Sequence, residues 1–302
     1  MHRELKAPSG MDHKELGPII LAHGVLGFNR IFFIRYFNGV LSQLREKGYE
    51  AYSTKVSKAG SIAKRAGELK EAILNIPELS ERLVVLEKGN GNTKIDGSIV
   101  PGLNIIAHSM GGLDARYMIS RLGMDTYVDS LTTISTPHTF DPVIDLIPTA
   151  FGEELKIIDV LKKLFVDMEA FGDLTTKSIQ EFNETTPDAP GVKYFSYAGA
   201  KKYIHRREFF HTSFMYLTEN FGPNDGLVTV EGSKWGEYIR TIDADHLEQI
   251  GWGNFINIPE NLKVPEKIRE LSLKFIRRFN DGYFDHLSFY VEIAEMLSKE
   301  TR

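Results

Sequence analysis

The chain has 302 residues, a formal net charge of −5 from 41 acidic and 36 basic side chains, and no cysteine. The mild acidic excess is not typical of a nucleic-acid-binding protein, which needs a basic face. The lack of cysteine excludes disulfides, thiolate metal sites and cysteine nucleophiles. With 42% hydrophobic and 25% charged residues, the chain has the balance of a globular protein with a sizeable core.

The first 17 residues mix both charge signs and contain no apolar stretch of the kind found in a signal peptide. No apolar run approaches the roughly 20 residues that a membrane-spanning helix needs. We therefore expect a soluble chain without a transmembrane segment. Its compartment stays open, because it is either cytoplasmic or a secreted protein whose signal is absent from this chain.

Short apolar runs alternate with longer amphipathic ones, which predicts a mostly parallel sheet with crossover helices, an α/β fold. The strands are expected at Pro18–His23, Tyr49–Thr54, Leu103–His108, Leu131–Ser135, Tyr194–Ala198 and Tyr238–Ile242. Helices are expected at Ala63–Leu74 and Gly111–Leu122, where apolar residues recur at helical spacing.

Two stretches interrupt this alternation. Residues 87–102 are rich in Gly and Asn and read as a loop or hairpin insert. Residues 139–190 lack a strand signal, and apolar side chains between Leu155 and Met168 fall on one helical face. This run is either an ordinary core-facing helix or part of a mobile cap that covers a site and can meet lipid.

A candidate nucleophile lies in the sequence Ala-His-Ser-Met-Gly-Gly, residues 107–112. Ser109 stands between a predicted strand and a predicted helix, with small residues around it, as a small-x-Ser-x-Gly elbow requires. Such a turn exposes the hydroxyl, and the helix N-terminus favours negative charge that develops beside it. The alternative is an incidental serine in a glycine-rich turn, and the strand–turn–helix context favours the elbow.

A serine needs a base, and three downstream histidines could supply it. His205 lies in a basic segment, and His211 adjoins two phenylalanines and fits a core or a pocket wall equally well. His246 follows the last predicted strand, where a base reaching a serine at the top of the sheet would stand. We therefore predict that His246 is the base.

The acid that orients this histidine is predicted to be Asp225, in the turn Asn224-Asp225-Gly226. A buried carboxylate there can hold the imidazole tautomer and stabilise the imidazolium. Asp243 and Asp245 are alternatives, but residues so close to His246 in sequence rarely reach under its ring, and loop capping is their ordinary role.

The negative charge that develops on the substrate oxygen needs two backbone N–H donors. Met110, immediately after the serine, supplies one by position. The segment from His23 to Phe28 follows the first predicted strand, so the N–H of Val25 is the expected second donor.

Taken together, five motifs resemble the bacterial triacylglycerol lipases, which have the α/β-hydrolase fold. They are HGVLGF (23–28), AHSMGG with LDARY (107–117), STPH (135–138), NDGLV (224–228) and DHLEQIGW (245–252). The resemblance spans most of residues 17–252, and it implies a Ser109–His246–Asp225 catalytic triad with Val25 and Met110 as the oxyanion hole. It also implies one α/β-hydrolase domain over residues 1–302, with a helical lid or cap inserted within residues 139–190.

The chain also departs from this family. Many members bind calcium through an acidic residue two positions after the catalytic histidine; Glu248 has that position, but the later ligands are not evident. No cofactor is expected to be required, with calcium held open at Glu248. The disulfide of some members cannot form, zinc lacks a His/Asp cluster, and residues 257–282 extend beyond the family's usual end.

The resemblance and the triad together predict a carboxylic ester hydrolase that cleaves triacylglycerols through an acyl-serine intermediate, at a lipid–water interface. A carboxylesterase or phospholipase of the same fold is the nearest alternative. A catalytically silent lipid-binding protein is a third, since a fold does not by itself imply activity.

Overall fold

The computed structural model describes residues 16–24, 36–57, 60–89, 94–95, 98–140, 170–204, 210–252 and 284–300. Six strands form its central sheet: β1 (Ile19–Ala22), β2 (Ala51–Ser53), β5 (Leu103–His108), β6 (Val128–Ile134), β7 (Lys193–Gly199) and β8 (Glu237–Ile242). They lie in the order β2-β1-β5-β6-β7-β8, and every neighbouring pair is parallel. The predicted parallel α/β sheet is therefore confirmed, with each strand close to its expected bounds.

The helices within the described residues are α1 (Val40–Glu46), α2 (Ile62–Leu74), α3 (Ser80–Gly89), α4 (Gly111–Arg121), α7 (Ala170–Asp173), α8 (Thr176–Thr185), α9 (His211–Phe221), α10 (Val230–Ser233) and α12 (His286–Glu300). The described residues also contain two short 3-10 helices, η1 (Pro77–Leu79) and η2 (Glu248–Ile250). The insert predicted at residues 87–102 contains a small antiparallel hairpin of β3 (Lys94–Ile95) and β4 (Ser98–Ile99). Among the described residues, no helix is both long and apolar enough to cross a membrane.

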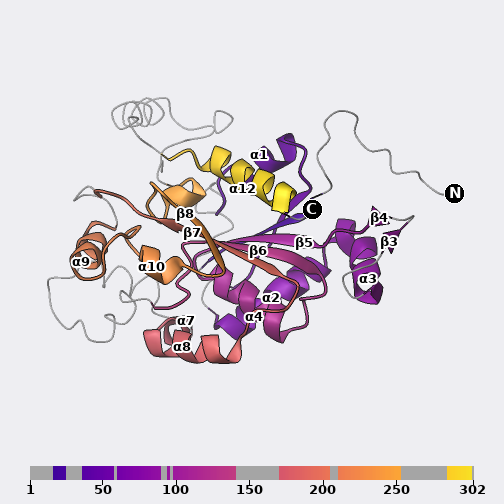
Figure 1. Ribbon diagram of the computed structural model, residues 1–302, viewed down its shortest axis with the longest axis horizontal. Coiled ribbons are helices and arrows are strands. Elements are labelled where there is room, and N and C mark those ends of the chain that lie inside the picture. Colours follow the sequence, from indigo (N-terminus) through magenta and orange to yellow (C-terminus); the bar gives the residue numbers. More distant parts are fainter. Residues whose placement is uncertain are drawn as a thin grey trace, which may run out of the picture.

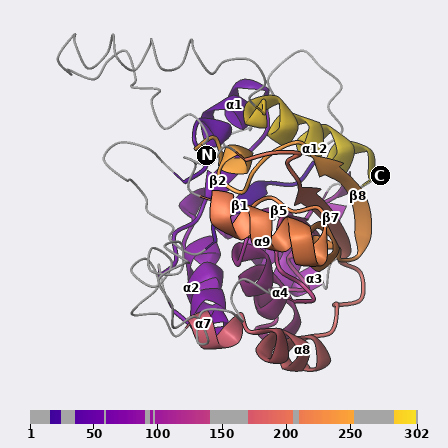
Figure 2. The ribbon, with the colours of Figure 1, turned by 90° about the vertical axis from the view of Figure 1, so that its left-hand side faces the viewer.

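Helices cover both faces of the sheet. One face carries α1 and α12, and the other carries α2 and α4 (Figures 1 and 2). The central strands are therefore covered on both sides, which explains why every residue of β1 and β5 is buried rather than every second one.

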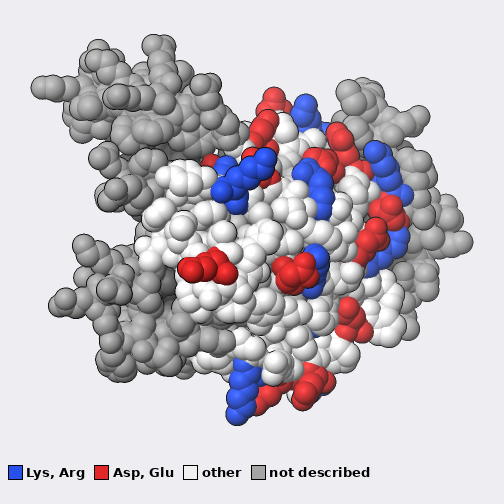
Figure 3. Space-filling view, turned by 60° about the vertical axis from the view of Figure 1, so that its left-hand side comes forward, with Lys and Arg blue, Asp and Glu red and all other residues white. Residues whose placement is uncertain are grey.

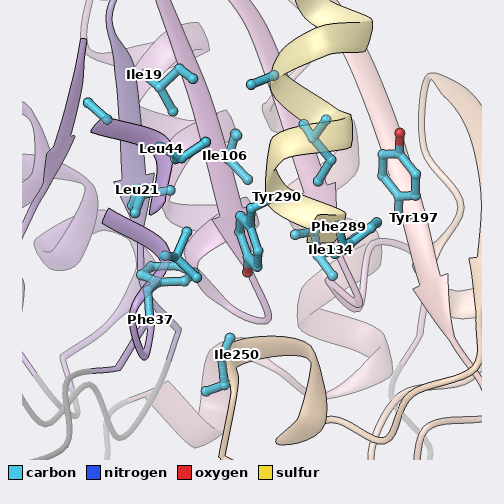
Figure 4. Packing of buried hydrophobic residues seen from close by; sticks show 14 of the residues in the cluster. Ile19, Leu21, Phe37, Leu44, Ile106, Ile134, Tyr197, Ile250, Phe289 and Tyr290 are labelled. Carbon is cyan, nitrogen blue, oxygen red and sulfur yellow. The ribbon is translucent and has the colours of Figure 1, made fainter. Parts of the chain in front are cut away.

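The core between the sheet and α12 is rich in aromatic residues. Phe289 and Tyr290 of α12 pack among Ile106, Ile134 and Phe37, as Figure 4 shows. The rings of Phe37 and Tyr290 meet edge to face, with their centroids 5.8 Å apart. The sequence patterns do not predict α12, although its apolar face covers this side of the sheet together with α1.

The loops that follow the strands meet at the carboxyl-terminal edge of the sheet, and short hydrogen bonds align them there. Ser109 donates its N–H to the carbonyl of Ile134 at 2.9 Å, and Ser135 donates to that of Tyr197 at 2.9 Å. Ala200 does the same to Ile242 at 2.9 Å. This edge is where an open parallel sheet places its ligands.

Four expectations concern residues outside the described ranges: the helical run within residues 155–168, the extension at residues 257–282, the histidine at position 205, and the oxyanion donor at Val25. Of the expected cap at 139–190, residues 141–169 also lie outside, so the cap and the single-domain boundary stay predictions. The described part of that stretch contains α7 and α8.

Candidate active site

Ser109 occupies the predicted elbow. β5 ends at His108, α4 begins at Gly111, and Ser109 between them has a φ of 57°, which non-glycine residues rarely adopt. Backbone conformations of this kind persist where the surrounding structure enforces them, and they gather at functional sites. The hydroxyl of Thr136 adds a further restraint, because it donates to the carbonyl of Ser109 at 2.6 Å.

The neighbours of Ser109 must be small, as the sequence predicts. A side-chain carbon at Gly24 would lie 2.7 Å from the Cβ of Ser109, and one at Gly111 would lie 2.7 Å from the carbonyl oxygen of Ala22. At Gly112 the clash would be with the side chain of Thr136. The glycines therefore let the loop after β1 and the start of α4 close in around the serine.

His246 and Asp225 are brought together by the fold. The Nδ1 of His246 lies 2.8 Å from the Oδ2 of Asp225, and the backbone N–H of His246 donates to the carbonyl of Asp225 at 3.0 Å. The Asp225 carboxyl is completely buried. Its Oδ1 accepts the N–H groups of Leu227 and Val228 at 3.0 and 2.8 Å, and its Oδ2 also accepts from Gln249 at 2.8 Å.

These contacts decide the ionisation of Asp225. Burial on its own would raise the pKa of this carboxyl, but the imidazole of His246 and the two backbone N–H groups outweigh it and lower the pKa below its usual value. The carboxylate is therefore anionic near neutral pH, as a group that orients a histidine and stabilises its imidazolium must be.

The alternative candidates are placed differently. His211 begins α9, and its Nδ1 contacts the carbonyl oxygen of Ile204 at 2.8 Å. The Asp243 side chain is 77% exposed. Asp245 caps its own loop, since its Oδ1 accepts the N–H groups of Leu247 and Glu248 at 2.8 and 2.7 Å. Asp245 thus has the loop-capping role that its spacing predicts, whereas the exposed Asp243 pairs with Lys201 at 3.5 Å.

Two buried partners of this site were not found from the sequence. The His108 ring lies 4.5 Å from that of His246, centroid to centroid, and its Nδ1 lies 2.7 Å from the hydroxyl of Tyr36. Burial, followed by the charge of His246, lowers the pKa of His108 well below its ordinary value, so His108 is neutral. The second buried partner is Gln249, which donates to Asp225 and lies three residues after His246 within the DHLEQIGW motif.

The loop after β1 is held from beneath by a buried ion pair. Arg65 contacts Asp114 of α4 at 2.7 Å and donates to the carbonyl of His23 at 2.9 Å. Burial raises the pKa of Asp114 to about 6, against the opposing effect of Arg65. Gly24 then lies against Ser109, while Val25, the predicted oxyanion donor, is outside the described residues. Met110, the other predicted donor, is buried at the N-terminus of α4.

Helix α8, in the described part of the expected cap, is tied to α4 through Arg116. This buried guanidinium donates to the side chain of Asn183 in α8 at 2.8 Å and lies 3.5 Å from the ring centroid of Trp235. Asn183 in turn donates to the carbonyl of His138 at 2.7 Å, within the STPH motif. The motif is therefore in direct contact with α8.

The fold and the serine elbow define an α/β-hydrolase. No protein-family model matches the sequence. The chain is 35% identical to triacylglycerol lipase 2 of Saccharomyces cerevisiae over 282 residues, which cover 90% of this chain and 76% of the yeast protein. It is 26% identical to the triacylglycerol lipase of Vibrio cholerae, with 77% of this chain and 79% of that protein covered. The chain therefore belongs to the triacylglycerol lipase family.

Comparison with solved structures gives the same α/β-hydrolase fold. The mature lipase BlEst2 of Bacillus licheniformis superposes with a TM-score of 0.61 at 21% identity, over 89% of this chain and 95% of that one. The predicted α/β-hydrolase fold is thus confirmed. The chain is an ester-hydrolysing enzyme of the lipase and esterase class, and the resemblance stated from its motifs is confirmed.

Proposed function

We propose that the chain hydrolyses triacylglycerols through an acyl-Ser109 intermediate, with His246 as the base and Asp225 as the acid that orients it. The observation that carries this proposal is the buried pair of His246 and Asp225, 2.8 Å apart, beside the strained elbow of Ser109. The names of the yeast and Vibrio relatives point to the same substrate.

In the proposed reaction, His246 takes the hydroxyl proton of Ser109 as its oxygen attacks the ester carbonyl carbon. The N–H groups of Met110 and Val25 stabilise the oxyanion. His246 then gives the proton to the departing alcohol, which leaves the acyl group on Ser109. A water molecule, deprotonated by His246, attacks that acyl group, and the proton returns to Ser109 as the fatty acid leaves.

We also propose that the enzyme acts at a lipid–water interface, and the exposed apolar side chains on and near α9 support this part of the proposal. Met215 of α9 is 50% exposed, Phe221 at its end is 39% exposed, and the nearby Tyr203 is 61% exposed. On the face where α9 lies, the middle and left of the described surface carry few charged side chains (Figure 3). Apolar side chains that remain exposed beside a site can enter a lipid surface.

The activity is tested with Ser109→Ala, assayed on p-nitrophenyl esters and on glycerides and phospholipids of graded acyl length. We expect hydrolysis of every ester to fall to background, and the wild-type Ser109 to react with a fluorophosphonate probe. Near-wild-type hydrolysis by the variant would refute the role of Ser109. A profile confined to short, monomeric esters would indicate a carboxylesterase instead, and a preference for phospholipids would indicate a phospholipase.

The interface is tested with Met215→Glu on α9. We expect slower hydrolysis of emulsified triacylglycerol and unchanged hydrolysis of soluble p-nitrophenyl butyrate. Val84→Glu is the matched control, because Val84 is 46% exposed on α3, far from α9 (Figure 1). Equal losses in the two variants would contradict a role for α9 at the interface.

A further inference from the structure

The loop that carries His246 closes on itself through two reciprocal hydrogen bonds. The Oδ1 of Asp245 accepts the N–H of Glu248 at 2.7 Å, and the Oε2 of Glu248 accepts the N–H of Asp245 at 2.8 Å. His246 lies between these two residues. The position of its backbone is therefore linked to the position of the Glu248 carboxylate.

Lys201 holds that carboxylate from outside the loop. Its Nζ lies 3.1 Å from the Oε2 of Glu248 and 3.5 Å from the Oδ1 of Asp243. The side chains of Lys201 and Glu248 are only 16% and 9% exposed, so solvent screens their pair weakly. Burial alone would lower the pKa of Lys201, but Glu248, Asp243 and Asp245 together raise it, which keeps the ammonium charged.

Lys201 also reaches the acid of the triad through its backbone. The residue follows β7 by two positions, and its N–H donates to the carbonyl of Asn224 at 3.1 Å, next to Asp225. One residue therefore contacts both the turn that carries Asp225 and the loop that carries His246. Such a residue can fix the position of His246 relative to Asp225.

A calcium ion does not fit these donors. Calcium takes six to eight oxygen ligands, whereas the Oε2 of Glu248 already accepts a backbone N–H and the Lys201 ammonium. A divalent cation at Glu248 would also be repelled by that ammonium. Within the described part of the chain, no three His, Asp or Glu residues are grouped so that they could hold a metal ion.

We propose that the Lys201 ammonium, rather than a divalent cation, holds the Glu248 carboxylate and with it the His246 loop, so that Lys201 is a positioning residue and hydrolysis needs no calcium. The inference rests on the proposed role of His246 as the base. Lys201 touches neither the substrate nor the reacting atoms; it acts through Glu248.

The first test measures the activity and thermal stability of the wild-type enzyme in two conditions, in the presence of EDTA and in the presence of added calcium. We expect kcat on p-nitrophenyl esters to agree within about twofold in the two conditions. The midpoint of thermal unfolding should also be the same. Loss of activity or of thermal stability in EDTA, restored by calcium, would overturn the proposal.

The second test replaces Lys201. We expect Lys201→Met to lower kcat by about tenfold or more with KM within about twofold, because the base moves while the substrate pocket does not. Lys201→Arg, which keeps the charge, should recover kcat to within about threefold of the wild type. Lys202→Met is the matched control, since Lys202 is the exposed neighbouring lysine, and it should keep the wild-type kcat. A wild-type kcat in Lys201→Met would overturn the proposal.

A double-mutant cycle distinguishes the loss of the Lys201–Glu248 ion pair from a general loss of structure caused by one unpaired buried charge. Lys201→Met and Glu248→Gln should each lower kcat, and the double variant should lose no more than the worse single variant, because both act through one ion pair. Multiplying effects would refute the pairing. Failure of the proposed function is recognised separately, since Ser109→Ala would then retain activity whatever Lys201 does.

Discussion

Replacement of Asp225 by asparagine gives a sharp prediction because the surroundings fix how the new amide must lie. The Oδ1 of Asp225 accepts two backbone N–H groups, from Leu227 and Val228. An asparagine therefore keeps its carbonyl oxygen at that position and turns its NH2 group toward His246 and Gln249. The side chain then offers a donor where the wild type offers an acceptor.

This reversal has two consequences. His246 can no longer donate from Nδ1, so it adopts the tautomer that carries the proton on the nitrogen facing the serine and cannot act as a base. The amide of Gln249, which donates to Asp225 at 2.8 Å, also loses its acceptor. In a serine protease the equivalent change lowers kcat about 10⁴-fold, or about 5.5 kcal/mol of transition-state stabilisation.

We therefore expect Asp225→Asn to lower kcat by about 10⁴-fold with little change in KM, measured under saturating p-nitrophenyl ester. Asp125→Asn is the matched control, because Asp125 is exposed near the end of α4, and it should keep the wild-type kcat. A folded Asp225→Asn enzyme that loses less than about tenfold in kcat would show that Asp225 does not orient the base.

Three further predictions concern the loop after β1. Arg65→Met should destabilise the fold by about 3–5 kcal/mol in urea unfolding, because Asp114 would stay buried without its ion-pair partner. Gly24→Ala should lower kcat by about 100-fold, since the new methyl group would lie 2.7 Å from the Cβ of Ser109 and displace that side chain. Burial lowers the pKa of His23 to about 4, so between pH 6.5 and 4 the unfolded chain binds a proton that the folded chain does not, and stability falls as the pH falls. His23→Gln should reduce the loss of unfolding free energy between pH 6.5 and 5 by about 2 kcal/mol, and an unchanged pH slope would contradict this reasoning.

The sequence sufficed wherever the signal is local. The strand at Leu103–His108, the turn at Ser109 and the helix from Gly111 follow one another in the chain, so their order and small residues reveal the elbow directly. Strand β1 is easy to find because a strand that is buried on both faces tends to be a continuous apolar run. The sequence favours His246 over His211 because a base that reaches Ser109 has to follow a strand at the same edge of the sheet.

Contacts between distant segments could not be read in this way. Tyr36 reaches His108 across 72 positions, and Arg65 reaches Asp114 across 49. No periodicity marks such pairs, because their geometry exists only once the sheet order brings β1 beside β5. Likewise, α12 packs against α1 although more than 230 positions separate them in sequence, and its aromatic face is explained only by the sheet beneath it.

The proposed acid, Asp225, and the proposed base, His246, are each held by hydrogen bonds within their own segment of the chain. Asp225 is fixed by the N–H groups of its own turn, and the His246 loop is fixed by the reciprocal bonds of Asp245 and Glu248. The turn that carries Asp225 and the loop that carries His246 are connected by the backbone hydrogen bond from His246 to Asp225. Lys201 connects them as well, because it contacts both segments. Because neither segment depends on the other for its local geometry, damage at Lys201 should separate them without unfolding either. Such damage should therefore appear in kcat before it appears in stability.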